Sequence, residues 1–188
     1  MMVTLLLVLG LGNALLLWAC LRLRVRVQAL EAALKIDGLS GVLNRNAALA
    51  CIEAQRMRVQ QGSTDVWSLA FLDMDSLKDI NDQGGHAAGD AAIRKLASTL
   101  RRECPADWAL GRYGGDEFIV LAPVQAEVLE QGLQHVLVKL PTRLSFTAKA
   151  ARLQGGMAVA EQLNRLSLAV LEHKTKQHGE QQGTPVHV

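Results

Sequence analysis

Residues 66–72 form a nearly continuous apolar run of strand length, Val-Trp-Ser-Leu-Ala-Phe-Leu. Such a run, without regular alternation of polar and apolar positions, is typical of a central strand that is buried on both faces. The chain has 188 residues, enough for one domain of ordinary size around such a strand. Its apolar content of 49% excludes disorder for most of the chain. Helices are expected over about 47–60, 76–82, 90–102 and 125–140.

Charge and cysteine content exclude several classes of function. The chain has 20 Lys and Arg against 18 Asp and Glu, for a formal net charge of +2. A dedicated nucleic-acid binder needs a strong basic excess, so we expect no nucleic-acid partner. The cysteines Cys20, Cys51 and Cys104 are widely spaced. This spacing argues against a disulfide framework or a cysteine zinc site and fits a reducing compartment.

The first 21 residues carry no charged side chain, and Arg22, Arg24 and Arg26 follow at once. About 20 helical residues span a hydrocarbon core ~30 Å thick, and cationic residues stay on the cytoplasmic side. We therefore expect a transmembrane helix over 1–21, single-pass insertion in the inner membrane and a cytoplasmic remainder. A cleaved signal peptide is the less favoured alternative, because its positive charge would precede the apolar run.

Residues 22–36 are expected to connect this segment to the main domain. Their apolar positions are spaced 4, 3 and 4 residues apart, at Leu23, Val27, Leu30 and Leu34. This is the a/d pattern of a coiled coil, over fewer than two heptads. A dimerising helix and an amphipathic linker on the domain or on lipid fit this pattern equally well, and both interpretations stay open.

A pair of acidic residues follows the central apolar run. Asp73 and Asp75 stand two residues apart, so on a strand their side chains point the same way. Like charges that close repel each other unless a cation or hydrogen-bond donors lie between them. The pair therefore indicates a cation site, with two solvated acids at a strand end as the alternative.

A second acidic pair lies at the tip of a predicted hairpin. Strand-like runs flank Gly114 and Gly115, a pattern typical of a β-hairpin. Glycines at a tip permit close approach of the backbone to phosphate, and Asp116 and Glu117 beside them can hold a metal that bridges phosphates. With Arg112 ahead of the tip as an available cation, the two acidic sites together indicate phosphoryl or nucleotidyl transfer.

Three segments resemble those of GGDEF-domain diguanylate cyclases, which make cyclic di-GMP from two GTP. They are DGLSGVLNR at 37–45, LDMDSLKDINDQGGHAAGD at 72–90 and GRYGGDEF at 111–118. The resemblance implies an α/β (α+β) fold like the palm of nucleotidyl cyclases and polymerases, with a central mixed, largely antiparallel sheet flanked by helices. It also implies Mg²⁺, or Mn²⁺ in its place, and release of pyrophosphate. One domain holds one GTP, so a homodimer with facing sites, set by the connector helix, is implied.

The resemblance also implies roles for single residues. Asp73, the Met74 carbonyl and Asp116 would bind Mg²⁺, and Glu117 would be a further ligand or the base for the ribose 3′-hydroxyl. Asp116 and Glu117 are thus the implied catalytic pair. The residues implied to bind GTP are Lys78, Asn81, His86, Asp90, Arg112, Gly114, Gly115 and Lys176. Of these, Asn81 and Asp90 would contact the guanine edge, and Lys78 and Lys176 the phosphates.

Two other residues match the family, and the C-terminal part departs from it. Asp37 and Arg45 match a family pair at the entrance of the domain. The domain is expected over 37–179, with a divergent C-terminal part in which 154–158 stands where the family has a strand. A disordered tail is expected over 180–188. The divergence keeps an alternative open, a catalytically degenerate GGDEF module that binds GTP or a partner protein as a regulator.

Overall fold

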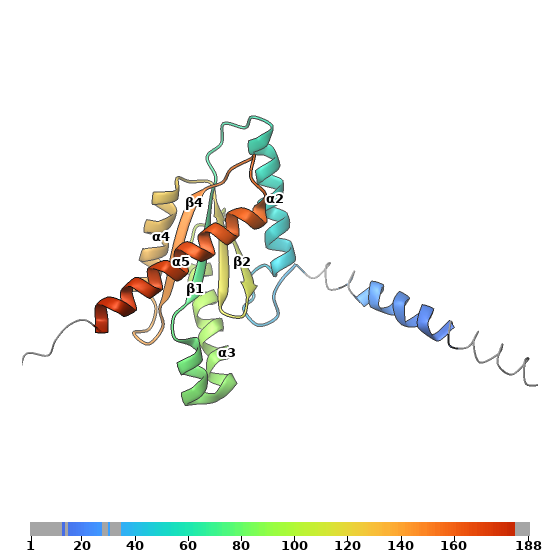
Figure 1. Ribbon diagram of the computed structural model, residues 1–188, viewed down its shortest axis with the longest axis horizontal. Helices are drawn as coiled ribbons and strands as arrows, with labels where there is room; N and C mark the ends of the chain where they lie inside the picture. The colour runs from blue at the N-terminus through green and yellow to red at the C-terminus, as the bar shows by residue number, and fades with distance from the viewer. Residues whose placement is uncertain (1–12, 14, 28–29, 31–34, 183–188) are drawn as a thin grey trace, which may run out of the picture. The chain divides into compact units, whose positions relative to one another are not determined.

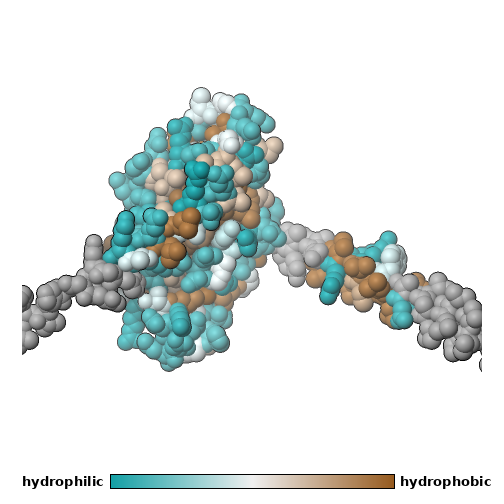
Figure 2. Space-filling view, viewed as in Figure 1, coloured by the Kyte–Doolittle hydropathy of each residue, from teal (hydrophilic) through white to brown (hydrophobic). Residues whose placement is uncertain are grey.

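The computed structural model describes residues 13, 15–27, 30 and 35–182. The chain divides into two compact units, residues 1–35 and 36–188. In the first unit the stretch 15–27 is helical, and its large apolar side chains, Trp18 among them, are exposed. Figure 2 shows apolar colour along this described stretch.

The structure contradicts the predicted inner-membrane location. Among the described residues, no helix is both long enough and apolar enough to cross a membrane. The helical stretch 15–27 would rise only about 20 Å at ~1.5 Å per residue, and it contains Arg22, Arg24 and Arg26. Residues 1–12 and 14 of the predicted span, and 28–29 and 31–34 of the connector, lie outside the described residues.

The second unit is a four-stranded sheet with helices on both faces (Figure 1). Along the chain its elements are α2 (Arg45–Gln60), β1 (Ser68–Met74), α3 (Leu77–Glu103), β2 (Ala109–Gly114), β3 (Glu117–Ala122), α4 (Ala126–Val138), β4 (Phe146–Arg152) and α5 (Val159–Gln182). The strand order is β2-β3-β1-β4, and every neighbouring pair is antiparallel. This arrangement confirms the palm-like α/β fold with an antiparallel sheet. The expected mixed character is not found among these four strands, because the parallel bridge between Leu43 and Gly111 is isolated from the strand ladders.

Strand β1 is buried on both faces, as its apolar run predicts. Leu69 and Phe71 face a core shared with α2 and α5, while Ala70, Leu72 and Met74 face a core shared with α3 and α4. Figure 1 shows α5 crossing the first of these faces. Each large side chain fully buried in this way stabilises the fold by roughly 1.5–3 kcal/mol. The end of β1 is therefore held firmly in place, and the acidic residues follow it there.

Helix α3 consists of two helical segments joined at Gly85. Gly85 has φ 72° and ψ 175°, a backbone conformation that residues with a Cβ atom rarely adopt. The two segments agree with the separate helices expected over 76–82 and 90–102. The break lets the two segments meet at an angle, and this brings residues before and after Gly85 close together.

The C-terminal part differs from the sequence expectation in two places. The edge strand beside β1 is Phe146–Arg152, whereas 154–158 lies in the loop that leads to α5. A Cβ on Gly155 would lie 2.5 Å from the backbone nitrogen of Gln60, so this glycine serves close packing against the end of α2. Helix α5 also runs to Gln182, into the segment expected to be disordered, and 183–188 lies outside the described residues.

Both edges of the sheet are covered locally. At β2, the backbone of Leu43 accepts from Arg112 N at 2.9 Å and donates to Leu110 O at 3.0 Å. At β4, the Glu130 carboxylate accepts a hydrogen bond from Ala150 N at 2.9 Å. Three backbone groups at the two edge strands, Leu110 O, Arg112 N and Ala150 N, thus have partners within the chain.

Candidate active site

The two acidic pairs meet at one end of the sheet. Asp73 on β1 lies directly opposite Glu117 on β3 in the antiparallel register. The Met74 backbone nitrogen donates to the Asp116 carbonyl oxygen at 3.2 Å. The structure therefore brings together Asp73, Met74, Asp116 and Glu117, the four residues that the sequence analysis proposes for metal binding.

A lysine from α5 enters the same place. The Lys174 ammonium donates to Asp73 Oδ1 and, at 3.0 Å, to the Met74 carbonyl oxygen. It also lies 3.0 Å from Asp75 Oδ1, which accepts a further hydrogen bond from the Thr147 hydroxyl at 3.0 Å. Three oxygens at the end of β1 thus converge on one positive charge supplied by the chain.

This oxygen set has the chemistry of a Mg²⁺ site. Carboxylate and carbonyl oxygens are the hard ligands that Mg²⁺ prefers, and the ammonium shows that they already point toward a common cation. Within the described residues, no group of three His, Cys, Asp or Glu side chains is gathered as a metal cluster. The set at the end of β1 includes a backbone carbonyl, and its carboxylates are drawn to Lys174. These oxygens are of the kind that would hold Mg²⁺, and three of them contact Lys174.

The charges of the site shift two pKa values. Burial raises the pKa of Glu117, and the negative charges of Asp73 and Asp116 raise it further. Burial alone would lower the pKa of Lys174, but its hydrogen bonds and charge attraction to Asp73 and Asp75 outweigh this and raise it. The crowded carboxylates thus raise both pKa values, that of Glu117 by repelling a further negative charge and that of Lys174 by attracting a positive one.

The break in α3 brings the proposed guanine contacts together. Asn81 precedes the break and packs against Gly89 beyond it: a Cβ on Gly89 would lie 2.0 Å from Asn81 Oδ1. Asp90 is the next residue, with its side chain 48% exposed and 3.9 Å from Arg94. The Asn81 amide thus lies beside the residue that precedes Asp90, and an amide and a carboxylate are groups that can pair with a purine edge.

The hairpin tip is tied to the entrance of the domain. Arg112 donates to the Gly115 carbonyl oxygen from Nε at 3.0 Å and from Nη2 at 2.7 Å. Its Nη1 donates to Asp37 Oδ1 at 3.2 Å. The partner of Asp37 is therefore Arg112, and the sequence expectation that Asp37 and Arg45 act as a pair is corrected. The substrate role of Arg112 stays a prediction, because its guanidinium here positions the tip.

Arg45 has a different contact. Its guanidinium lies 4.3 Å from the centre of the Tyr113 ring and donates to the Tyr113 hydroxyl at 3.1 Å. The Tyr113 ring in turn packs edge-on against Phe71 in the core at 5.6 Å between ring centres. Arg45 thus supports the hairpin from the side of α2.

The remaining proposed GTP contacts are open to solvent or lie at the tip. Lys78, His86, Gly115 and Lys176 are exposed, and Gly114 is half-buried. Their roles in substrate binding stay predictions. None of them is held in a fixed arrangement comparable to the oxygen set at the end of β1.

Lys174 is the functional residue that the sequence analysis missed. The spacing to the following Gly179 indicates Lys176 instead. In the structure Lys176 is exposed, whereas Lys174 reaches the acids. The helical period was the available signal: Leu166 and Val170 are buried on α5, and the next position at i+4 is 174.

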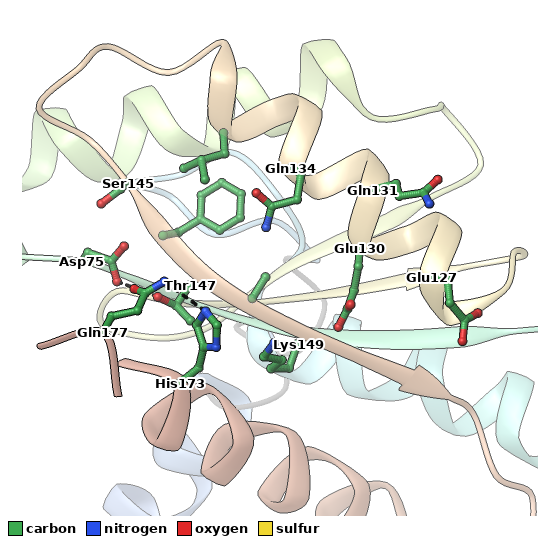
Figure 3. A pocket seen from close by; sticks show the side chains of 13 residues that line it. Asp75, Glu127, Glu130, Gln131, Gln134, Ser145, Thr147, Lys149, His173 and Gln177 are labelled. Atoms are coloured by element: carbon green, nitrogen blue, oxygen red, sulfur yellow. Dashed lines mark hydrogen bonds between the residues drawn. The ribbon is translucent and has the colours of Figure 1, made fainter. Parts of the chain in front are cut away.

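A cavity of about 670 Å³ lies beside the site, between α4, β4 and the end of α5. Figure 3 shows Asp75, Thr147 and Gln177 near one another at one end of it and Glu127 toward the other. Gln177 Nε2 lies 3.0 Å from His173 Nε2. The cavity touches the oxygen set only through Asp75, so Asp73, Asp116 and Glu117 lie outside its lining.

Comparison with known proteins agrees with this geometry. The sequence matches the family model "Diguanylate cyclase, GGDEF domain" over residues 34–178. Diguanylate cyclase DgcP of Pseudomonas aeruginosa is 40% identical over 98 residues, which are 52% of this chain and 14% of DgcP. Cyclic di-GMP phosphodiesterase PdeR of Escherichia coli is 29% identical over 140 residues, which are 73% of this chain and 21% of PdeR. The chain thus spans a small part of the length of these relatives.

A solved structure shows the same fold. The coiled coil and GGDEF domain of DgcB from Caulobacter crescentus, in complex with c-di-GMP, has a TM-score of 0.70 and 25% identity. The match covers 89% of this chain and 95% of that one. Together with the family match over residues 34–178, this shows that the chain belongs to the diguanylate cyclase GGDEF-domain family.

Proposed function

We propose that this chain is a diguanylate cyclase, which condenses two GTP into cyclic di-GMP and two pyrophosphates with Mg²⁺. The observation that carries the proposal is the convergence of Asp73 Oδ1, Met74 O and Asp75 Oδ1 on a single cation. This oxygen set lies beside a glycine hairpin in a chain of the GGDEF family. The acids that the reaction needs are all present and lie close together.

The residues of the site are assigned roles as metal ligands and as a general base. Asp73, the Met74 carbonyl and Asp116 would hold Mg²⁺, which when bound offsets phosphate charge and polarises the attacked α-phosphate. Mn²⁺ would fit the same oxygens. Glu117, with its raised pKa, is suited to accept the proton of the ribose 3′-hydroxyl from a position beside the metal ligands.

Guanine would be selected on α3. A carboxylate at Asp90 accepts from the N1 and N2 donors of guanine, and the Asn81 amide can pair with the remaining edge. Adenine lacks these donors, so ATP would leave Asp90 unpaired. Lys78 and the backbone of Gly114 and Gly115 are available to the phosphates.

Catalysis by this arrangement requires two copies. Each domain would hold one GTP, and the 3′-hydroxyl of each nucleotide would attack the α-phosphate of the other. A homodimer with facing sites is therefore part of the proposal, and the helical residues ahead of the domain are available to set the pairing.

The test is product formation by the purified full-length chain with GTP and Mg²⁺, followed by mass spectrometry. Asp116→Asn removes the negative charge of a proposed metal ligand and leaves the core unchanged. Turnover should therefore fall by at least about 10³-fold, while the melting temperature stays within a few degrees of the wild-type value. Product formation undiminished in Asp116→Asn would refute the metal assignment.

A second function is favoured by one specific observation. PdeR, a cyclic di-GMP phosphodiesterase, is similar to 73% of the length of this chain. A GGDEF module can therefore be part of a protein with another activity. If calorimetry shows that the wild-type chain binds GTP, yet the chain forms no product, the assignment changes from a cyclase to a catalytically degenerate regulatory module.

A further inference from the structure

Lys174 contacts oxygens that are proposed to bind a metal ion. Its ammonium contacts Asp73 Oδ1, Met74 O and Asp75 Oδ1, and the first two belong to the set proposed to bind Mg²⁺. We propose that Lys174 competes with the divalent cation for these oxygens, so that the cation binds tightly only when a nucleoside triphosphate is present to receive the ammonium. This inference rests on the proposed function and adds a control of metal loading to it.

The contact matches the chemistry of both partners. A lysine ammonium is a compact charge with three donors, and three oxygens of different groups surround it here. The side chain of Lys174 is only 20% exposed, and those of Asp73 and Asp75 are 30% and 26% exposed. Limited access of water strengthens the attraction relative to an ion pair on the open surface.

The ammonium and the metal cannot share the site. Two cations within a few ångströms repel each other strongly in a partly buried environment, and both would draw on the Asp73 carboxylate and the Met74 carbonyl oxygen. Entry of the metal therefore requires Lys174 to leave. Without a new acceptor, the departing ammonium loses its hydrogen bonds, and this loss weakens metal binding.

A triphosphate supplies the new acceptor. Its oxygens carry the negative charge that Lys174 needs, and the flexible four-carbon stem lets the ammonium move a few ångströms without moving α5. Nucleotide would then strengthen metal binding through Lys174, and by linkage the metal would strengthen nucleotide binding by the same factor. A domain built in this way does not hold metal in the absence of substrate.

The experiment measures Mn²⁺ binding to the full-length chain by the electron paramagnetic resonance signal of the free ion. Titrations are run without nucleotide and with guanosine α,β-methylene triphosphate, which cannot react at the α-phosphate. Lys174→Met keeps the length of the stem and removes the charge, and Lys174→Gln is a second variant in case the first is unstable. Lys176→Met is the matched control, because it makes the same change on an exposed position of α5.

Without nucleotide, Lys174→Met should bind Mn²⁺ at least about tenfold more tightly than wild type, and the nucleotide should strengthen its metal binding less. Lys176→Met should bind Mn²⁺ as wild type does in the absence of nucleotide. Asp116→Asn should reduce metal binding in the presence of the analogue in every background.

The outcomes separate the two proposals. If wild type binds Mn²⁺ with the analogue in an Asp116-dependent way, but neither Lys174 variant binds it more tightly without nucleotide, competition is refuted and the metal site stands. If no chain binds Mn²⁺ in an Asp116-dependent way even with the analogue, the metal site fails and the competition fails with it.

Discussion

The two halves of the proposed site are built differently. The metal half lies at the end of a strand buried on both faces, and its acids are held by Lys174 and Thr147. The guanine half lies on the helix α3, around a break at Gly85, with the Asp90 side chain 48% exposed. The first half fixes charge in one geometry before any ligand binds. The second offers donors and acceptors in an open position, so changes in the two halves should have different kinetic signatures.

The largest expected effect is in the metal half. Asp73→Asn removes one charge from the oxygen set and should lower kcat by about 10²–10³-fold, because the group acts where charge develops. The ratio of GTP to ATP turnover should stay as in wild type, since α3 is untouched. Steady-state kinetics with both nucleotides check this. A changed base preference would show that the halves are coupled.

A tenfold to hundredfold effect is expected in the guanine half. In Gly89→Ala the new methyl would lie 2.0 Å from Asn81 Oδ1, so the Asn81 amide must move. KM for GTP should rise by about 10–100-fold, as expected when a buried pairing is lost, with kcat much less affected. Gly156→Ala is the control, because its Cβ would meet nothing within 4 Å. An unchanged KM in Gly89→Ala would refute the assignment of Asn81 as a guanine contact.

A smaller effect on stability is expected where the hairpin is tied to the domain entrance. Hydrogen bonds from Ser40 and Arg112 outweigh burial and lower the pKa of Asp37. A lowered carboxylate pKa stabilises the fold above the ordinary value near 3.8, and this stability is lost as pH falls through the lowered value. Asp37→Asn should therefore cost about 1–2 kcal/mol at pH 7. Urea unfolding from pH 7 to pH 2 should show the difference from wild type shrinking below the ordinary value, and a constant difference would contradict the ion pair.

The smallest effect is expected on the other side of the hairpin. Arg45→Met removes the cation from the face of Tyr113 and should cost about 0.5–1 kcal/mol of unfolding free energy. Thermal unfolding measures it, with Tyr113→Phe as the variant that loses only the hydroxyl contact. If Arg45→Met lowers the unfolding free energy more than Asp37→Asn does, the ranking of the two supports is wrong.

The sequence predicts much of the fold because its strongest signals are local. The apolar run 66–72 and the glycine tip at 114–115 identify the central strand and the hairpin, and both lie where expected. The edge strand was misplaced because Phe146–Arg152 has small and charged residues on an exposed edge, and such a strand lacks a clear apolar pattern. The predicted membrane helix depended on an uncharged run and on the arginines that follow it, and no such helix is found among the described residues.

The site was predictable wherever a motif keeps its spacing, and not where partners come from distant segments. Asp73 and Asp116 stand in such motifs, but the link between Lys174 and Asp73 joins α5 to β1 across 101 residues. A match by spacing to Gly179 pointed to Lys176, and only the buried period of α5 distinguishes the two lysines. The pairing of Asp37 with Arg112 was likewise hidden, because Arg45 is nearer in sequence and carries the same charge.

The covered sheet edges have a consequence for self-association. A bare edge strand is a template on which another chain can add a strand, the first step of edge-to-edge aggregation. Here the backbone of Leu43 occupies β2 and the charged Glu130 occupies a donor of β4. Continuation of the sheet from one copy into the next would have to break these bonds and desolvate a carboxylate. Addition of a strand from another copy is therefore disfavoured at these positions.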